Sequence, residues 1–183
     1  RAQLSNNEPY VQYYYRHVAY RDYPVVGISY EQAVAYCKWR TERVKNYLTI
    51  KKDFKHQNFE YRLPRKVEWE RLADYSTLAL NNNGKNEKGK CQLNCVNPLP
   101  NGDCMTKENA DVTAPVKSYN KNILGLYNVL GNVAEMVGEK GISKGGGWKN
   151  SLEQCRVGFD AEYIKPNAWL GFRCVCIVKK GNS

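Results

Sequence analysis

The most regular hydrophobic pattern lies in the first third of the chain and has a helical period. Ser29 is a typical helix N-cap, and Gln32 stands three residues later, where its side chain completes a capping box. We therefore predict a helix that starts here and runs to about residue 47. Its apolar side is formed by residues that recur at helical spacing: Ala33, Val34, Cys37, Trp39 and Val44.

A second helix is predicted at residues 65–77. Pro64 directly precedes it, and proline suits the first turn of a helix because its missing N–H is not needed there. The predicted buried face again follows the helical period. It comprises Val67, Trp69, Leu72 and Ala73.

Extended and irregular segments surround these helices. Residues 10–20 are aromatic and strand-prone, and residues 114–119, 133–137 and 174–178 are predicted as short strands between glycine-rich turns. Residues 80–113 have almost no apolar period and are predicted as a long irregular loop. Two helices followed by short strands indicate the α+β class.

The length of 183 residues suits one domain with a proper core. We assign residues 1–20 to an N-terminal leader or edge segment and residues 21–183 to the domain. No run of 18 apolar residues occurs, so no membrane span is predicted. The polar start carries no signal peptide and fits a mature form whose targeting segment has been removed.

Charge adds one consideration, because 28 Lys and Arg outnumber 18 Asp and Glu and give a net charge of +10. This composition fits either a soluble cationic surface or an acidic partner. The basic residues are scattered, and no helix-turn-helix, zinc-finger or RNA-binding signature is present. We therefore expect no nucleic-acid partner.

Cysteine usage favours an oxidising compartment. Zinc would require paired Cys or His knuckles, and neither His17 nor His56 lies near a cysteine pair. Disulfides fit better, although an odd number leaves at least one thiol free or paired outside the chain. A local disulfide is expected within the irregular loop. The seven cysteines are Cys37, Cys91, Cys95, Cys104, Cys155, Cys174 and Cys176.

Several other chemistries are poorly supported. Two separated histidines cannot supply the facial cluster of an iron enzyme, and they give little support to Ser-His or Cys-His catalysis. The glycine run at residues 145–147 lacks the Gly-Lys-Ser/Thr ending of a phosphate loop and is interpreted as a tight turn.

Six segments, taken in order, resemble the formylglycine-generating enzyme or sulfatase-modifying-factor family. That resemblance implies a variant of the C-type lectin fold with much irregular structure. The segments are Tyr23-Pro-Val-Val-Gly-Ile-Ser-Tyr-Glu-Gln-Ala-Val-Ala-Tyr-Cys37, Arg62-Leu-Pro-Arg-Lys-Val-Glu-Trp-Glu70, Ala114-Pro-Val116, Gly125-Leu-Tyr-Asn-Val-Leu-Gly-Asn-Val-Ala-Glu135, Lys144-Gly-Gly-Gly-Trp148 and Leu170-Gly-Phe-Arg-Cys174.

The resemblance implies a structural calcium site. In the family an Asn side chain, two backbone carbonyls and a Glu form it, and the matching positions are Asn128, Gly131, Val133 and Glu135. Hard oxygen ligands of this kind suit Ca²⁺. The alternative is that Asn128 caps a turn and Glu135 pairs with a nearby lysine.

The resemblance also implies a disulfide between Cys37 and Cys174. A closed loop of this length would add about 4–5 kcal/mol of stability in the chain-entropy model. The alternative is two buried free thiols.

Catalytic members of the family use two cysteines, five residues apart, to bind Cu(I), a soft ion that thiolates suit. Here Cys155 holds the second position but Asn150 holds the first. Gly147 replaces a family serine, and Ala134 replaces the pocket tryptophan. We therefore expect no copper and no enzyme activity.

The sequence thus predicts a non-catalytic interaction module of a cell envelope. It resembles gliding-motility and type IX secretion lipoproteins of Gram-negative bacteria, which implies the periplasm or outer-membrane surface, other envelope proteins as partners, and a lipidated anchor on a missing N-terminal segment. One alternative is a copper-dependent oxidase with an altered site that uses Cys155 alone. Another is a lectin-like domain that binds ligands through residues 144–168.

Overall fold

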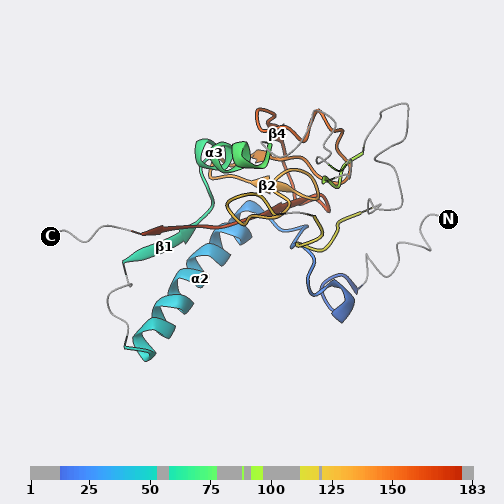
Figure 1. Cartoon of the computed structure of the whole chain (residues 1–183). Helices are drawn as coiled ribbons and strands as arrows, with labels where there is room; N and C mark the ends of the chain where they lie inside the picture. The colour runs from blue at the N-terminus through green and yellow to red at the C-terminus, as the bar shows by residue number, and fades with distance from the viewer. Residues whose placement is uncertain are drawn as a thin grey trace.

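The computed structural model describes residues 13–52, 58–77, 88, 92–96, 112–119 and 121–178. Two α-helices, a short 3-10 helix and six short strands form along these residues (Figure 1). In chain order they are η1 (Val18–Tyr20), α2 (Tyr30–Ile50), β1 (Phe59–Arg62), α3 (Lys66–Thr77), β2 (Ala134–Met136), β3 (Ile142–Lys144), β4 (Ala161–Glu162), β5 (Leu170–Phe172) and β6 (Val175–Val178).

Helix α2 begins where the capping box predicts. The Ser29 hydroxyl accepts the Gln32 N–H at 3.2 Å, and the Gln32 side chain accepts the Ser29 N–H at 2.8 Å. The helix continues three residues beyond the predicted end, to Ile50. Trp39 is 50% exposed, so its assignment to the apolar side is wrong. It lies two residues from buried Cys37, which places it on a different side of the helix.

Helix α3 starts one residue later than predicted. Trp69 and Ala73 are fully buried, as expected, but Val67 is 57% exposed and its predicted burial is wrong. Val67 is two residues from Trp69 and therefore faces away from the core. Carboxylates of Glu68 and Glu139 accept the N–H groups of Arg65 and Lys66, which satisfies the first turn.

A four-stranded sheet in the order β4-β3-β2-β5 forms the centre of the molecule. Strand β2 runs antiparallel to β3 and parallel to β5. Ala134 and Met136 pack with residues of α2, whereas the next residue along, Val137, packs with Trp69 of α3. Because alternate residues of a strand point to opposite faces, the two helices cover opposite sides of β2.

The second sheet is a ribbon of β1 and β6, in which Phe59 pairs with Val178 and Arg62 with Val175. It packs against α2, and the far end of α2 projects away from the central sheet together with this ribbon (Figure 1). Among the described residues, no helix is long and apolar enough to cross a membrane.

The predicted strands at 133–137 and 174–178 are confirmed by β2 and β6. The predicted strand at 114–119 is wrong, because residues 116–119 form turns and bends and residues 114–115 have no regular structure. The described part of 10–20 is also not a strand. There the Tyr13 carbonyl accepts the N–H groups of Arg16 and His17, and η1 follows. Most of the 80–113 loop, with Cys91 and Cys104, lies outside the described residues.

Candidate functional site

A buried carboxylate at the centre of β2 organises the polar part of the site. Glu135 is only 4% exposed. Arg173 donates to both of its oxygens, from Nη2 to Oε1 at 2.5 Å and from Nε to Oε2 at 2.6 Å. Trp69 Nε1 donates to Oε2 at 2.7 Å. These three contacts supply the partners that a carboxylate needs when it is removed from water.

A buried lysine continues this polar layer on the neighbouring strand. Lys144 is paired with Glu135 in the β2–β3 register and is fully buried. Its Nζ lies 2.9 Å from Glu70 and 2.6 Å from Asp160. Burial alone would raise the pKa of Asp160, but hydrogen bonds from Lys144 and Lys66 outweigh this effect and lower it.

Three of the four residues predicted to bind calcium line one cavity of about 890 Å³: Asn128, Val133 and Glu135. The fourth, Gly131, is not among its lining residues, and its N–H donates to the carbonyl of residue 145. The Asn128 amide nitrogen donates to the carbonyl of Pro115 at 3.3 Å. Its Oδ1 is buried and accepts no hydrogen bond from the described residues.

The donor set therefore fits calcium only in part. The Asn128 oxygen is available, but the partner of Glu135 is Arg173, which also reaches the carbonyls of Tyr127 at 3.1 Å and Asn128 at 3.4 Å. A cation at these ligands would have to share Glu135 with that guanidinium. Among the described residues no three His, Cys, Asp or Glu side chains group to hold a metal, so amide and backbone oxygens would have to complete the set.

At the first catalytic position of the family, Asn150 forms a structural turn. Its Oδ1 accepts the Gly147 N–H at 2.9 Å, and its Nδ2 donates to Gln154 at 3.1 Å. Its backbone carbonyl accepts the Val96 N–H at 2.8 Å. The side-chain amide of Asn150 therefore holds the turn together, and its backbone carbonyl docks the segment 92–96.

At two further positions, 147 and 134, the structure leaves no room for the larger residue that the family resemblance implies. A Cβ on Gly147 would lie 3.1 Å from the Trp169 carbonyl oxygen and 3.2 Å from the Ala134 nitrogen, so a serine would press on the backbone. Ala134 is fully buried in the cluster that contains Cys37 and Leu170. A tryptophan at this position would have to displace those neighbours.

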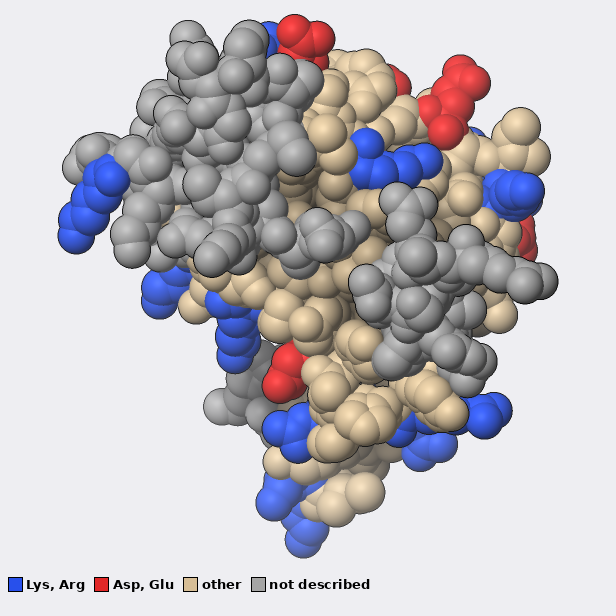
Figure 2. All heavy atoms as spheres, turned by 90° about the vertical axis from the view of Figure 1, so that its right-hand side faces the viewer, with Lys and Arg blue, Asp and Glu red and all other residues tan. Residues whose placement is uncertain are grey.

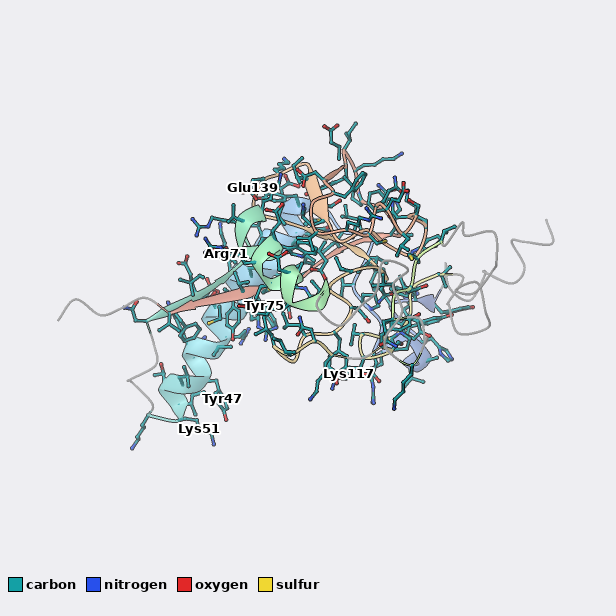
Figure 3. All side chains as sticks on the ribbon, turned by 45° about the horizontal axis from the view of Figure 1, so that its top comes forward. Tyr47, Lys51, Arg71, Tyr75, Lys117 and Glu139 are labelled. Atoms are coloured by element: carbon teal, nitrogen blue, oxygen red, sulfur yellow. The ribbon has the colours of Figure 1, made fainter. Side chains whose placement is uncertain are left out.

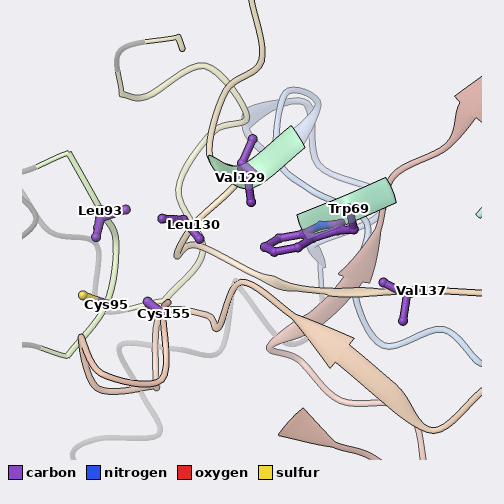
Figure 4. Close-up of a cluster of buried hydrophobic side chains, with 8 residues drawn as sticks. Trp69, Leu93, Cys95, Val129, Leu130, Val137 and Cys155 are labelled. Atoms are coloured by element: carbon purple, nitrogen blue, oxygen red, sulfur yellow. The ribbon is translucent and has the colours of Figure 1, made fainter. Parts of the chain in front are cut away.

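At the second catalytic position, Cys155 points into the hydrophobic core. It is 2% exposed and belongs to the same cluster as Cys95, Leu130 and Trp69 (Figure 4). The Cys95 and Cys155 side chains are hydrogen-bonded to each other, which lowers the pKa of Cys95 and raises that of Cys155. The partner of Cys155 is thus Cys95, in the segment 92–96.

The predicted disulfide partners, Cys37 of α2 and Cys174 before β6, do lie together. Their sulfur atoms are 3.2 Å apart. This contact raises the pKa of Cys37 and lowers that of Cys174. The bond itself remains a prediction, and peptide mapping without reduction tests it.

Sequence reasoning missed three members of the polar layer. Trp69 was expected only as a core residue, and Lys144 and Arg173 appeared only as parts of longer motifs. The register of β2 and β3, which pairs Glu135 with Lys144, could have found only Lys144. That register depends on the tertiary fold, because these strands are only three residues long.

Comparison with known proteins agrees with this architecture. A family model described as the sulfatase-modifying factor enzyme 1-like domain matches residues 6–178. The chain belongs to this family. The fold is accordingly α+β, of the C-type-lectin-like kind found in formylglycine-generating enzymes.

Among relatives, the chaperone protein LppX of Paenibacillus barcinonensis is 29% identical over 190 residues, which cover 80% of this chain and 68% of LppX. Among solved structures, PvdO from Pseudomonas aeruginosa has a TM-score of 0.58 at 18% identity and covers 85% of this chain, which spans 62% of PvdO. CarF has a TM-score of 0.58 at 18% identity, with 90% of this chain and 70% of CarF covered. Treponema denticola variable protein 1 has a TM-score of 0.56 at 18% identity, with 87% and 73% covered. At this identity the structural likeness shows the fold alone.

Proposed function

We propose that this family member is non-catalytic and acts as a protein-interaction module in a cell envelope. The observation that carries the proposal is the use of Asn150. Its side chain is committed to the Gly147 N–H and to Gln154. A neutral amide is a hard ligand and cannot replace the first of two thiolates around Cu(I).

The second catalytic position supports the same conclusion. Cys155 is 2% exposed and contacts Cys95, so its sulfur faces the core. A sulfur that binds a soft ion together with a substrate thiol must be reachable from solvent. The relative LppX, which is named a chaperone protein, also supports an interaction role.

The decisive experiment incubates the purified chain with Cu(I), oxygen and a peptide containing Cys-x-Pro-x-Arg. Mass spectrometry then follows conversion of the peptide cysteine to an aldehyde. We expect no product above a Cys155→Ala control, because neither family position offers an accessible thiolate. Turnover that depends on Cys155 would overturn the non-catalytic assignment and favour the altered oxidase.

More specifically, we propose that the chain is part of a gliding-motility or type IX secretion complex. It is supported by the family resemblance of the motifs and by the absence of a complete catalytic pair. Chemical cross-linking in native membranes, followed by purification through an affinity tag on the full-length protein, tests it. Recovery of the chain only in a soluble fraction, without envelope proteins, would contradict this placement.

A structural calcium ion remains part of the proposal, with Asn128, Gly131, Val133 and Glu135 as its ligands. The buried, unpartnered Oδ1 of Asn128 supports it. EDTA should then lower the melting temperature, and calcium should restore it. Asn128→Ala should remove the response while leaving the Glu135–Arg173 pair intact. An identical melting temperature with calcium and with EDTA would contradict the ion.

A further inference from the structure

The cavity beside α2 has the form of a groove rather than a closed core. It encloses about 890 Å³ between the first half of α2 and three loops, at residues 23–28, 116–117 and 125–128. Its apolar lining comes from side chains of several segments. They include Val25, Ile28, Val116, Leu126 and Phe172.

Several apolar side chains at this groove remain exposed to solvent. Val25 is 48% exposed, Tyr36 is 40% and Val116 is 41%. Leu124, next to the lining residue Gly125, is 46% exposed. Exposed apolar side chains gathered around a concavity mark interaction surfaces more often than scattered ones do.

Aromatic residues of α2 extend this surface outward. The Tyr36 ring lies 5.5 Å from Phe172 inside the groove and 5.5 Å from Trp39 outside it. Tyr47 follows on the same side of the helix, because it lies eight positions after Trp39 and eleven after Tyr36, close to two and three full turns. Trp39 is 50% exposed and Tyr47 is 57% exposed. Tyrosine, tryptophan and arginine are the residues that contribute most to protein–protein binding energy.

The exposed charges of the groove are positive. Arg40 and Lys117 line it and are exposed. Among the described lining residues, the single acidic one is Glu135, which is buried and paired with Arg173. Arg43 adds a further positive charge 6.0 Å from the Trp39 ring. An acidic partner would therefore meet complementary charge along the rim and apolar surface on the floor.

On the face in Figure 2, Lys and Arg lie at several places, including the upper middle and the lower end, with acidic and other residues between them. Figure 3 shows Lys117 on a loop, and Tyr47 with Lys51 at the far end of α2. The lining of the groove combines basic residues with aromatic and aliphatic ones.

We propose that this groove binds an acidic peptide segment that carries apolar anchor residues and belongs to a protein partner. The inference rests on the proposed interaction function and names the chemistry of its partner. A peptide fits better than a membrane because the surface is concave. It fits better than a glycan because aliphatic side chains form much of the lining.

Fluorescence anisotropy with labelled peptides tests the proposal. The probe is a twelve-residue peptide in which glutamates alternate with leucine and phenylalanine. One comparison peptide has lysines for the glutamates, and another has serines for the apolar residues. We expect binding of the first peptide only. The lysine peptide lacks the acidic charge that would meet the basic rim, and the serine peptide lacks the apolar anchors that would fill the floor.

Charge-reversed variants locate the binding. Arg40→Glu with Lys117→Glu should weaken binding about tenfold or more, because both charges line the groove. A matched control, Arg71→Glu with Lys165→Glu, reverses two exposed charges elsewhere and should change affinity less than twofold. Circular dichroism should be unchanged for both variants, because all four side chains are on the surface. Loss of the Arg40 contact with the Tyr61 ring, 4.6 Å away, should lower the melting temperature of the first variant only slightly.

Two outcomes would count against the groove, and a third would count against the proposed function alone. Equal weakening by both variants would show attraction to net charge alone. Binding to anionic phosphatidylglycerol vesicles or to alginate, without binding to the acidic peptide, would replace the peptide by a membrane or a polysaccharide. Copper-dependent turnover with intact peptide binding would overturn the non-catalytic function and leave the groove standing.

A second, independent observation concerns Cys95 and Cys155. Their side chains contact each other in the core, at 6% and 2% exposure. The chain segments that carry them are also joined by a parallel bridge between Val96 and Ser151. The two cysteines lie next to each other at one end of the cluster in Figure 4.

We infer that Cys95 and Cys155 form a disulfide in an oxidising compartment. The two thiols lose two protons and two electrons as the sulfur–sulfur bond forms. A disulfide oxidant accepts the electrons and is reduced to two thiols. The bond would anchor the segment 92–96 and would remove the last family catalytic thiol from chemistry.

Alkylation of the unreduced, denatured protein, followed by digestion and mass spectrometry, tests this bond. We expect one cross-linked peptide pair containing Cys95 and Cys155, which reduction separates. In Cys155→Ala, Cys95 should become open to alkylation, whereas Cys176→Ser should leave the pair unchanged. Full alkylation of both cysteines, or a bond from Cys95 to Cys91 or Cys104, would overturn the inference.

Discussion

Two buried regions of the molecule hold residues of the family motifs, but they have been used differently. The carboxylate of Glu135 is held by Arg173 and Trp69, and Lys144 on the paired strand is held by Glu70 and Asp160. Around Cys155, the contacts are those of neutral groups: the Asn150 amide, the closely packed Gly147 and a buried thiol.

The difference follows from the cost of changing each region. A buried ion pair loses stability when one partner is removed, because the other charge is left unpaired in the interior. The contacts described around Cys155 are those of neutral groups, so a substitution there leaves no buried charge unpaired. We therefore expect substitutions in the first region to cost more stability than those in the second.

The largest effect is expected from Glu135→Ala. The substitution leaves Arg173 with its charge unpaired and the Trp69 N–H without its acceptor. The free energy of unfolding, measured in urea, should fall by about 3–5 kcal/mol. Glu31→Ala removes an exposed pair with Lys140 and serves as the control, with no measurable change expected. A comparable loss in both variants would erase the distinction between buried and surface pairs.

Restoring a family residue should be the next most damaging change. In Gly147→Ser the new Cβ meets backbone atoms at 3.1–3.2 Å, so the free energy of unfolding should fall by about 1–3 kcal/mol. At Gly158 a Cβ meets nothing within 4 Å, and Gly158→Ser should change stability little. Chemical denaturation of both variants measures the difference. A neutral Gly147→Ser would show that this turn still has room for the family serine.

Asn150→Ala should have a smaller effect. It leaves the Gly147 N–H without its acceptor and removes the contact with Gln154. The expected loss is about 1–2 kcal/mol in thermal or urea unfolding. Asn150→Asp retains the acceptor oxygen and should recover part of the loss. If Asn150→Ala were as stable as the native chain, the amide would not be holding the turn.

The smallest effect concerns pH. The hydrogen bond from Arg62, opposed by burial and helped by bonds from Arg65, holds the pKa of Glu68 well below its usual range. A depressed pKa stabilises the folded state above the unfolded pKa of about 4.3, and this stability is lost as pH falls below that value. Because the pair is partly exposed, the contribution should be about 1 kcal/mol or less.

The measurement is urea denaturation at several pH values between about 5 and 3. Glu68→Gln should flatten part of the decline in stability that the native chain shows over this window. Identical pH profiles for the two proteins would show that Glu68 is no more strongly held in the folded state than in the unfolded chain.

Local signals were enough to predict both helices. The capping box at Ser29 and Gln32 and the proline before α3 act within one turn, and the structure confirms both starts to within a residue. The errors at Trp39 and Val67 have one cause. Apolar residues were assigned to a buried face although they lie two positions from Cys37 and Trp69, on another side of the helix.

Short strands were harder to predict. Strands β2, β3 and β5 are three residues long, which is too short for an alternating pattern to be distinctive. The segment 114–119 has strand-like composition but no neighbouring strand pairs with it, and it forms turns instead. Whether such a short segment becomes a strand depends on pairing partners that are distant in sequence.

The sequence by itself determined the family and the helix starts, because ordered motifs and local capping are written in consecutive residues. The tertiary structure decided which groups meet: Arg173 with Glu135, Cys95 with Cys155, and the basic and aromatic residues that line one groove. These contacts join segments tens of residues apart. Their geometry depends on strand register and helix docking, which no local pattern specifies.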